Sequence, residues 1–496
     1  MEFINSNSSS NIHFVLVPFL AQGHIIPMID IARLLASRGI TVSFITTPAN
    51  LSRIKPTVDR VSESNLPVNF IPLAFPSTEF GLPDGCENLD SIPSPSSRVN
   101  FVSAAKSLKL PLTLYLRDPK TIPPPSCIIS DSGHSWTLDV ARELGVPRIV
   151  FHGFSCFSLL CIENLTRYKT HETVTSDSDT LVLPGLAQRI EMTRPQLPKQ
   201  FHNLTQFQEM RKEMREADLE SDGIVVNSFE ELETGYSGLL EKSSGKKVWM
   251  IGPVSMCSKG NEGFVHRGNK SCIGESKCSS WLDSRCPNSV VYVCFGSMGA
   301  FPPSQFMELG SGLLASNHYF IWAIKSVPSE ELGNWLDENF DESRCLVIRG
   351  WAPQLMILSH PAVGGFMTHC GWNSSLEGIC AGLPLATWPL FAEQFLNEKL
   401  LVEVLRIGVS VGVKKPSDYA GKLKDEVAVG REDVARVVEK LMDAGEEGEE
   451  RRQRARGFKE PAKKAMVESG SSYLNLTMLI DFVFNRFEDG VRKVNG

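Results

Sequence analysis

The sequence has no excess of positive charge, no long apolar run and no closely paired cysteines. Its 496 residues carry 50 Lys and Arg against 57 Asp and Glu, a net charge of −7. A mildly acidic chain lacks the basic surface that binding to nucleic acid or to an anionic membrane requires. No apolar stretch reaches the ~18 residues needed to cross a bilayer, so no membrane span is expected. The 12 cysteines include no Cys-x-x-Cys pair, which argues against zinc ribbons and thioredoxin-type sites.

The sequence also lacks a secretory signal and the glycine motifs of two common classes of nucleotide enzyme. Residues 1–11 carry Glu2 and no Lys or Arg, so a cytoplasmic protein with free thiols is expected. No Gly-x-Gly-x-x-Gly follows a strand, which argues against a dehydrogenase. Gly263 and Gly268 have P-loop spacing, but Asn269 stands where that motif needs lysine, which argues against an NTPase.

The sequence does contain a repeated alternation of buried strands and amphipathic helices. Residues 12–18 are a predicted strand, 28–38 a helix that Gly39 ends, and 40–46 a second strand. This order calls for a parallel sheet with right-handed crossovers. Further strands are predicted at 127–130, 146–151, 224–229, 248–252, 290–297 and 319–325.

One segment interrupts this alternation and suggests how the chain is divided. Residues 255–280 are rich in Ser, Gly, Lys and Asn and lack apolar periodicity, so they are a predicted linker. The predicted architecture is therefore two Rossmann-like, doubly wound α/β domains, residues 1–254 and 281–470, that face each other across a cleft. Residues 471–496 form a final helix. Ligands of such sheets bind at the carboxyl ends of the strands.

Polar residues stand where two of the predicted strands end. Gly23 and His24 follow the first strand, and Asp131 follows the strand at 127–130. A histidine in that position can act as a general base near neutral pH, and a carboxylate beside it fixes its tautomer and stabilises the imidazolium. The plainer alternatives are a loop histidine bonded to the backbone and an aspartate that caps a helix.

Residues 351–394 carry the densest set of polar groups. Gly371, Asn373 and Ser374 place N–H groups and a hydroxyl at a predicted helix N-terminus, which attracts phosphate. The segment adds further groups suited to a nucleotide sugar: His369 as a donor, Trp351 as a stacking face, and Glu377, Glu393 and Gln394 as partners of sugar hydroxyls.

This 44-residue segment resembles the signature box of plant UDP-dependent glycosyltransferases of family 1. Like that box, it begins with Trp-Ala-Pro-Gln, passes through His-Cys-Gly-Trp-Asn-Ser and ends with Glu-Gln. Gly23-His24, Asp131 and Phe295-Gly296-Ser297 match further features of the family, so the resemblance covers essentially the whole chain.

The resemblance implies a GT-B fold and a division of labour between the domains. The N-terminal domain would bind the acceptor and the C-terminal domain the UDP-sugar, and the last helix would pack back onto the N-terminal domain. The resemblance also implies the donor contacts, with Gly23 and Gly371 approaching the donor closely. Trp351 and the backbone of Ala352 would bind uracil, Gln354 and Glu377 the ribose, Ser297, His369, Asn373 and Ser374 the diphosphate, and Trp372, Glu393 and Gln394 the hexose.

The activity implied is that of an inverting O-glucosyltransferase in which His24 is the base and Asp131 balances its charge. A closing glutamine, here Gln394, is similar to what members that use UDP-glucose carry, and no cofactor or metal is expected. The expected acceptor is a triterpenoid or flavonoid hydroxyl, with Phe151, Phe154 and Phe157 as candidate pocket residues or, equally, a core stripe. The chain is expected to be a monomer.

Several alternatives stay open at this point. The donor could be UDP-galactose, UDP-glucuronic acid or UDP-xylose, and the acceptor a cytokinin or a steroid. The chain could also bind UDP-sugars without catalysis. Asp177-Ser178-Asp179 fits the Asp-x-Asp motif of metal-dependent glycosyltransferases, but no strand precedes it, and the surrounding polar stretch predicts a solvated loop.

Overall fold

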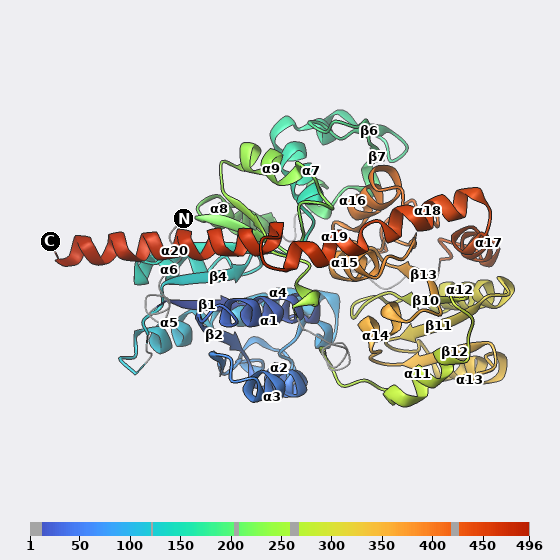
Figure 1. Ribbon diagram of the computed structural model, residues 1–496, viewed down its shortest axis with the longest axis horizontal. Helices are drawn as coiled ribbons and strands as arrows, with labels where there is room; N and C mark the ends of the chain where they lie inside the picture. Colours follow the sequence, from blue (N-terminus) through green and yellow to red (C-terminus); the bar gives the residue numbers. More distant parts are fainter. Residues whose placement is uncertain (1–11, 121–122, 203–207, 258–266, 418–425, 496) are drawn as a thin grey trace. The chain divides into compact units, whose positions relative to one another are not determined.

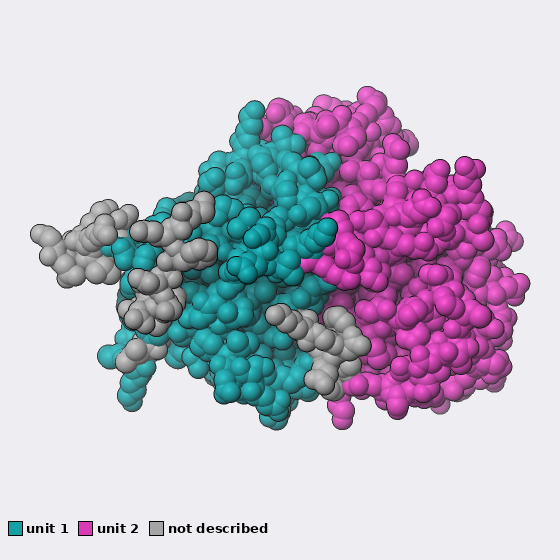
Figure 2. Space-filling view, viewed as in Figure 1, with its two compact units in different colours: residues 1–153, 204–257, 464–496 teal, residues 154–203, 258–463 magenta. Residues whose placement is uncertain are grey.

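The computed structural model describes residues 12–120, 123–202, 208–257, 267–417 and 426–495. Contacts within the chain divide it into two compact units (Figure 2). Unit 1 comprises Met1–Gly153, Leu204–Cys257 and Lys464–Gly496, and unit 2 comprises Phe154–Asn203 and Ser258–Lys463. The domain boundaries inferred from composition stay a prediction, and residues 258–266 of the predicted linker lie outside the described residues.

Unit 1 is built on a seven-stranded sheet in which every paired strand is parallel (Figure 1). The strands lie in the order β3 (Val68–Pro72), β2 (Thr41–Thr46), β1 (His13–Val17), β4 (Cys127–Asp131), β5 (Arg148–His152), β8 (Gly223–Val226) and β9 (Val248–Met250). The chain runs outward from β1 to β3 and then returns to the other side of β1. This reversal puts the switch point of the sheet between β1 and β4.

Helices cover both faces of this sheet. They are α1 (Gln22–Ala36), α2 (Pro48–Arg53), α3 (Lys55–Glu63), α4 (Arg98–Lys106), α5 (Lys109–Arg117), α6 (Thr137–Leu144), α8 (Gln208–Leu219), α9 (Tyr236–Ser244) and α20 (Ser471–Asn495). Phe14 and Leu16 of β1 join one buried cluster, and Val15 and Val17 join another. Alternate residues of one strand thus enter separate cores, which explains why the strand is apolar throughout.

Unit 2 repeats the same strand order. Its six-stranded parallel sheet has the order β12 (Cys345–Arg349), β11 (Tyr319–Ile324), β10 (Val290–Cys294), β13 (Val363–Thr368), β14 (Leu385–Thr387) and β15 (Gly408–Ser410). The order reverses between β10 and β13, which is the switch point of this sheet. A separate antiparallel pair joins β6 (Thr180–Val182) and β7 (Glu191–Thr193).

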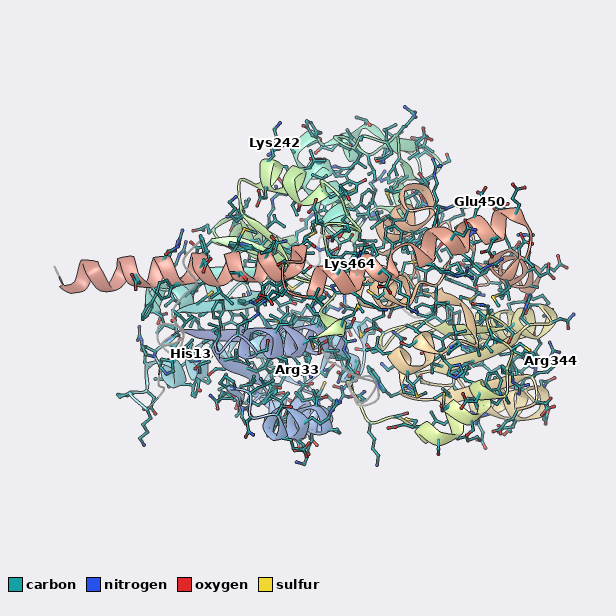
Figure 3. The ribbon with its side chains drawn as sticks, in the orientation of Figure 1. His13, Arg33, Lys242, Arg344, Glu450 and Lys464 are labelled. Carbon is teal, nitrogen blue, oxygen red and sulfur yellow. The ribbon has the colours of Figure 1, made fainter. Side chains whose placement is uncertain are left out.

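The helices of unit 2 surround this sheet and lead into the last segment of the chain. They are α7 (Cys156–Tyr168), α11 (Glu275–Asp283), α12 (Pro303–Ala315), α13 (Glu330–Asn339), α14 (Gln354–Ser359), α15 (Trp372–Ala381), α16 (Gln394–Lys399), α17 (Arg431–Met442) and α18 (Glu446–Arg456). The chain passes from unit 2 to unit 1 at Lys464, within α19 (Lys459–Met466; Figure 3). The prediction of two Rossmann-like α/β units with parallel sheets is confirmed.

The local predictions were incomplete, because the first helix was placed too late and strands β3, β12, β13, β14 and β15 were not predicted. The first helix begins at Gln22 and not at residue 28, so Pro27 lies inside α1 and His24 lies in its first turn. Strand β13 was not predicted because Gly364 and Gly365 weaken the strand signal. Tertiary packing explains both glycines, since a Cβ would lie 2.5 Å from the backbone of Asn288 at the first and 2.6 Å from Leu441 at the second.

Helix α20 contributes to the core of unit 1. Leu476, Leu479, Ile480 and Val483 belong to the same buried cluster as Phe14 of β1. The helix is also held by hydrogen bonds, since Asn475 Nδ2 donates to the carbonyl of Met250 at 3.0 Å and Ser472 donates to the carbonyl of Gly252. No helix in the described part of the chain is both long and apolar enough to cross a membrane.

We expect Leu479→Ala to destabilise unit 1 by about 2–5 kcal/mol, because this side chain is fully buried and its loss leaves a cavity. Met478→Ala is the matched control on the same helix, because Met478 is 52% exposed and should change stability by less than ~0.5 kcal/mol. Urea unfolding of both variants measures the difference. Equal effects would contradict the packing of α20.

Candidate active site

His24 and Asp131 meet at the switch point of the sheet in unit 1. Asp131 is the last residue of β4, which pairs with β1, and His24 lies in the first turn of the helix that follows β1. His24 Nδ1 lies 2.6 Å from Asp131 Oδ2. A carboxylate at this distance fixes the proton on Nδ1 and leaves Nε2 to accept another. The His24 side chain is 33% exposed, so a substrate can reach the ring.

Asp131 is held as a buried carboxylate. Its side chain is 2% exposed, and its other oxygen accepts the N–H of Gly133 at 3.0 Å. Burial alone would raise the pKa of Asp131, but the charge of His24 and the hydrogen bonds from His24 and Gly133 hold that pKa below its ordinary value. The plainer alternatives do not describe this pair, because His24 is helical and the N-cap of α6 is Trp136 rather than Asp131.

The neighbours of His24 restrict its ring. Phe19 packs edge-on against it, with the ring centres 5.5 Å apart. A Cβ at Gly153 would lie 3.7 Å from the imidazole, and a Cβ at Gly133 would lie 2.6 Å from the Phe19 ring. The distance at Gly153 is an ordinary van der Waals contact, so of these two positions only Gly133 has to lack a Cβ for the Phe19 ring to lie where it does.

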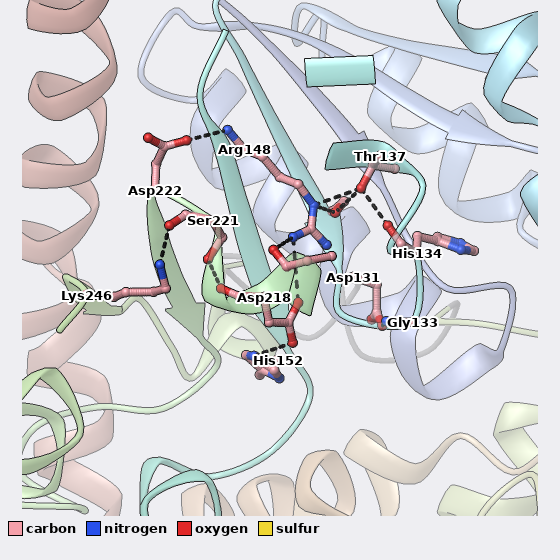
Figure 4. A network of polar contacts seen from close by, with 12 residues as sticks. Asp131, Gly133, His134, Thr137, Arg148, His152, Asp218, Ser221, Asp222 and Lys246 are labelled. Atoms are coloured by element: carbon pink, nitrogen blue, oxygen red, sulfur yellow. Dashed lines mark hydrogen bonds and ion pairs between the residues drawn. The ribbon is translucent and has the colours of Figure 1, made fainter. Parts of the chain in front are cut away.

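A buried arginine that no sequence pattern singled out lies near Asp131 (Figure 4). Arg148 has a fully buried side chain on β5. Its Nε–H donates to Ser130 Oγ at 3.1 Å and to Thr137 Oγ1 at 2.9 Å, and its Nη1 donates to the carbonyl of Ala217 at 2.9 Å. Ser130 precedes Asp131 and Thr137 begins α6, so the guanidinium joins both ends of the loop that carries Asp131.

Asp218 extends this network, because its carboxylate lies between Arg148 and His152. Its Oδ1 lies 3.6 Å from Arg148 Nη1, and its Oδ2 lies 3.5 Å from His152 Nε2. Burial raises the pKa of Asp218 to about 7 and lowers the pKa of His152 to about 4. His152 is therefore neutral at pH 7, while Asp218 is partly protonated.

In unit 2, the predicted phosphate-binding groups gather at the switch point between β10 and β13. Gly371 is the N-cap of α15, so Asn373 and Ser374 lie in the first helical turn. The ring of His369 packs tightly at this point, because a Cβ would lie 2.7 Å from it at Gly296 and 2.3 Å at Gly371. The predicted donor residue Ser297 follows Gly296 and is half-buried.

Three buried polar atoms at this helix end have no hydrogen-bond partner among the described residues. They are Thr368 Oγ1, His369 Nδ1 and Ser375 Oγ. Burial lowers the pKa of His369 to about 4, so the ring is neutral at pH 7. Unpaired buried polar groups are costly and rare. Beside the N–H groups of a ten-residue helix, they fit an anionic ligand such as a diphosphate.

The residues predicted to bind the base and ribose form a second cluster. Gln354 Nε2 donates to Glu377 Oε2 at 2.7 Å and lies 3.3 Å from Ser374 Oγ. Tyr292, which the sequence analysis missed, donates to Gln354 Oε1 at 3.3 Å. Trp351 is half-buried, and Ala352 is 8% exposed.

Glu393, one of the residues predicted to contact the hexose, is held by Asn397, which sequence reasoning also missed. Asn397 is fully buried; its Nδ2 donates to Glu393 Oε1 at 3.1 Å and to the carbonyl of Cys370 at 2.8 Å. Its Oδ1 accepts hydrogen bonds from Ser155 and Ser158. Its place one helical turn after Glu393 was the only sequence signal.

Gln394 and Trp372, the other two residues predicted to contact the hexose, have few polar groups available to a ligand. Gln394 Oε1 accepts the N–H groups of Leu390 at 2.8 Å and Phe391 at 3.0 Å, which leaves its Nε2 as a donor. Trp372 is 1% exposed as a whole residue, so its contact with the hexose stays a prediction that this burial weakens.

The three phenylalanines predicted for the acceptor pocket differ in unit and in burial. Phe151 is fully buried in the core of unit 1. Phe154 and Phe157 belong to unit 2, and of these Phe157 is fully buried. Phe154 alone of the three keeps partial exposure, so a pocket role for these residues remains a prediction that the burial of Phe151 and Phe157 weakens.

The Asp-x-Asp triplet lies in a turn before β6. Asp179 accepts the N–H groups of Thr175 at 3.0 Å and Ser176 at 2.8 Å, and Asp177 forms an exposed ion pair with Lys415. The local role of Asp179 is therefore to close the turn. Over the described ranges, no cluster of three or more His, Cys, Asp or Glu residues has metal-binding geometry.

Comparison with protein families gives two matches. Residues 10–256 match the family model described as "Glycosyltransferase, N-terminal domain", and residues 273–418 match "UDP-glucoronosyl and UDP-glucosyl transferase". UDP-glycosyltransferase 73C6 of Arabidopsis thaliana is 45% identical over 97% of this chain and 98% of its own length.

Two solved structures are similar to this chain in fold. Glycyrrhiza uralensis UGT73P12, complexed with glycyrrhetinic acid 3-O-monoglucuronide, has a TM-score of 0.89 and 36% identity over 98% of this chain and 97% of its own. Phytolacca americana UGT2, complexed with UDP-2fluoro-glucose and pterostilbene, has a TM-score of 0.73 and 28% identity over 95% of this chain and 99% of its own. The predicted fold class is confirmed.

We expect Asp218→Asn to change how stability depends on pH. Wild-type Asp218 keeps its proton up to about pH 7 when folded, whereas the unfolded chain releases it near the ordinary pKa of about 4. As the pH rises from about 4 to about 7, the free energy of unfolding of the wild type should therefore fall relative to that of the variant, by at most about 1.4 kcal/mol per pH unit. Above pH 7 the difference should be constant.

Urea unfolding at pH 5, 6, 7 and 8 measures this slope. Asp218→Asn also removes the carboxylate partner of Arg148. This loss changes the stability of the variant by the same amount at every pH, so it adds no dependence on pH. Asp59→Asn removes an exposed carboxylate and should run parallel to wild type. Parallel curves for Asp218→Asn would contradict the buried, protonated state.

Proposed function

The chain belongs to the plant UDP-glycosyltransferase family, and from this premise we propose that it transfers glucose from UDP-glucose to a hydroxyl of a small lipophilic plant metabolite, with inversion at the anomeric carbon. The observation that carries the proposal is the 2.6 Å hydrogen bond between His24 Nδ1 and Asp131 Oδ2. The buried carboxylate supports the basicity of this imidazole, whose side chain is 33% exposed.

His24 acts as the general base in this proposal. Its Nε2 takes the proton of the acceptor hydroxyl as the oxygen forms a bond to the anomeric carbon. The bond from that carbon to the diphosphate breaks at the same time, and UDP leaves from the opposite face. An α-linked donor therefore gives a β-glucoside. Asp131 stabilises the imidazolium, because its charge lies next to the protonated ring.

The donor is bound by unit 2 in this proposal. The N-terminus of α15, with His369, Asn373, Ser374 and Ser297, holds the diphosphate and stabilises its charge as UDP leaves. Trp351 and the backbone of Ala352 bind the uracil, Gln354 and Glu377 bind the ribose, and Trp372, Glu393 and Gln394 bind the hexose. These donors supply the charge stabilisation, so we propose that no metal is required.

The sugar and the acceptor are the finer parts of the proposal. The relative solved with UDP-2fluoro-glucose supports glucose, whereas the glucuronide in the UGT73P12 complex keeps UDP-glucuronic acid as the alternative. Glycyrrhetinic acid in that complex favours a triterpenoid acceptor, and pterostilbene in the other favours a phenolic one such as a flavonoid.

Turnover with UDP-glucose tests the activity. Wild-type protein and a panel of triterpenoid and flavonoid aglycones should give products heavier by one hexose, equally with and without EDTA. We expect His24→Ala to lower kcat by about 10²–10⁴-fold, the usual contribution of a general base, with UDP affinity unchanged. His318→Ala, in unit 2, is the control. A His24→Ala variant with wild-type turnover would sink the assignment, and product from another UDP-sugar alone would overturn the choice of glucose.

We expect Glu377→Ala to weaken UDP binding roughly 10–100-fold, because hydrogen bonds to a charged group contribute about 1.5–3 kcal/mol. Calorimetric titration with UDP measures the change. Glu330→Ala removes an exposed carboxylate from α13 of the same unit and should leave the affinity as it is. Unchanged affinity in Glu377→Ala would remove this residue from the donor site.

A further inference from the structure

Arg267 touches two residues of the proposed donor site at once, although no motif singles it out. Its backbone carbonyl accepts a hydrogen bond from Trp351 Nε1 at 3.2 Å. Its guanidinium forms an ion pair with Glu377. One residue therefore connects the side chain proposed to stack on the base with the carboxylate proposed to bind the ribose.

The segment that carries Arg267 is fastened to the same tryptophan. The N–H of Cys272 donates to the carbonyl of Trp351 at 2.9 Å, and the N–H of Trp351 lies 3.3 Å from Cys272 Sγ. Gly350 leaves room for this contact, because a Cβ there would lie 2.3 Å from that sulfur. Arg267 is thus held at the base and ribose end of the donor site by several contacts besides its own ion pair.

The charges explain what this arginine does. The Glu377 side chain is 7% exposed and that of Arg267 is 14% exposed. A buried carboxylate without a counter-ion is costly. It would also repel a diphosphate bound at the N-terminus of α15, the helix on which Glu377 itself lies. The ion pair removes both penalties.

We propose that Arg267 is a positioning residue of the donor site, which holds Glu377 and neutralises it so that a nucleoside diphosphate can bind; this rests on the proposed UDP-sugar transfer. Each carboxylate oxygen can accept two hydrogen bonds. Glu377 can therefore keep its contacts to Arg267 and Gln354 and still accept from ribose hydroxyls. If Arg267 instead competed with the ribose for Glu377, its removal should make UDP bind more tightly.

Titration of Arg267→Ala with UDP and with uridine tests the proposal. We expect UDP affinity to fall about 10-fold, because one partner of a buried charge pair is lost. Uridine, which has no phosphate, should lose only about 2–3-fold, because repulsion of the diphosphate is absent. KM for the UDP-sugar should rise as UDP affinity falls, and kcat should stay within about 3-fold of wild type.

Three further variants complete the experiment. Arg267→Lys keeps the charge and should recover most of the UDP affinity. Lys270→Ala removes an exposed cation from the same segment and should change nothing. In a Glu377→Gln background, where no carboxylate needs neutralising, Arg267→Ala should cost less than about 3-fold. Should the alanine variant fail to fold, Arg267→Gln replaces it with the same expectations.

The outcomes separate the inference from the function on which it rests. Wild-type protein that binds no UDP would overturn both. Wild-type protein that binds UDP, beside an Arg267 variant with unchanged or tighter binding, would overturn the inference alone. Equal losses for UDP and uridine, or an undiminished loss in the Glu377→Gln background, would show that Arg267 does not act through the charge of Glu377 and would overturn it as well.

Discussion

The parallel order of strands is the constraint on which the rest of this structure depends. Each of the two sheets reverses its strand order once, between β1 and β4 in unit 1 and between β10 and β13 in unit 2. The loops on either side of such a reversal diverge and leave a crevice at the carboxyl ends of the strands. His24 and Asp131 stand at the first of these points, and His369 and the N-terminus of α15 stand at the second.

Burial then decides what these groups can do chemically. Asp131 is almost inaccessible, yet it stays ionised because His24 and Gly133 bind it. His369 is kept neutral by burial, so in the proposed donor site it would meet an anion as a hydrogen-bonding group rather than as a cation. The same fold thus provides a carboxylate that supports a base and a set of neutral donors that suits a diphosphate.

A layer of residues behind the reactive groups fixes their geometry. Arg148 joins the two ends of the loop that carries Asp131, and Asn397 joins Glu393 to the backbone of Cys370. Arg267 forms an ion pair with Glu377. Arg148 and Asn397 are fully buried and bond to several elements, whereas the Arg267 side chain is 14% exposed and its guanidinium pairs with Glu377. Their removal is therefore expected to disturb a site that they do not form.

The sequence by itself determined the two α/β units, because apolar runs ended by polar or glycine residues identify buried parallel strands. It also identified His24, Asp131 and the segment 351–394, because residue type and local spacing indicate their chemistry. Tertiary structure alone decided the start of α1 at Gln22, the burial of Phe151 and Phe157, and the contacts of Arg148, Asn397 and Arg267. The physical reason is separation along the chain: His24 and Asp131 are 107 positions apart, and Arg267 and Glu377 are 110 positions apart. Periodicity reports which face of an element is buried, and only the packed sheets determine which distant side chains meet there.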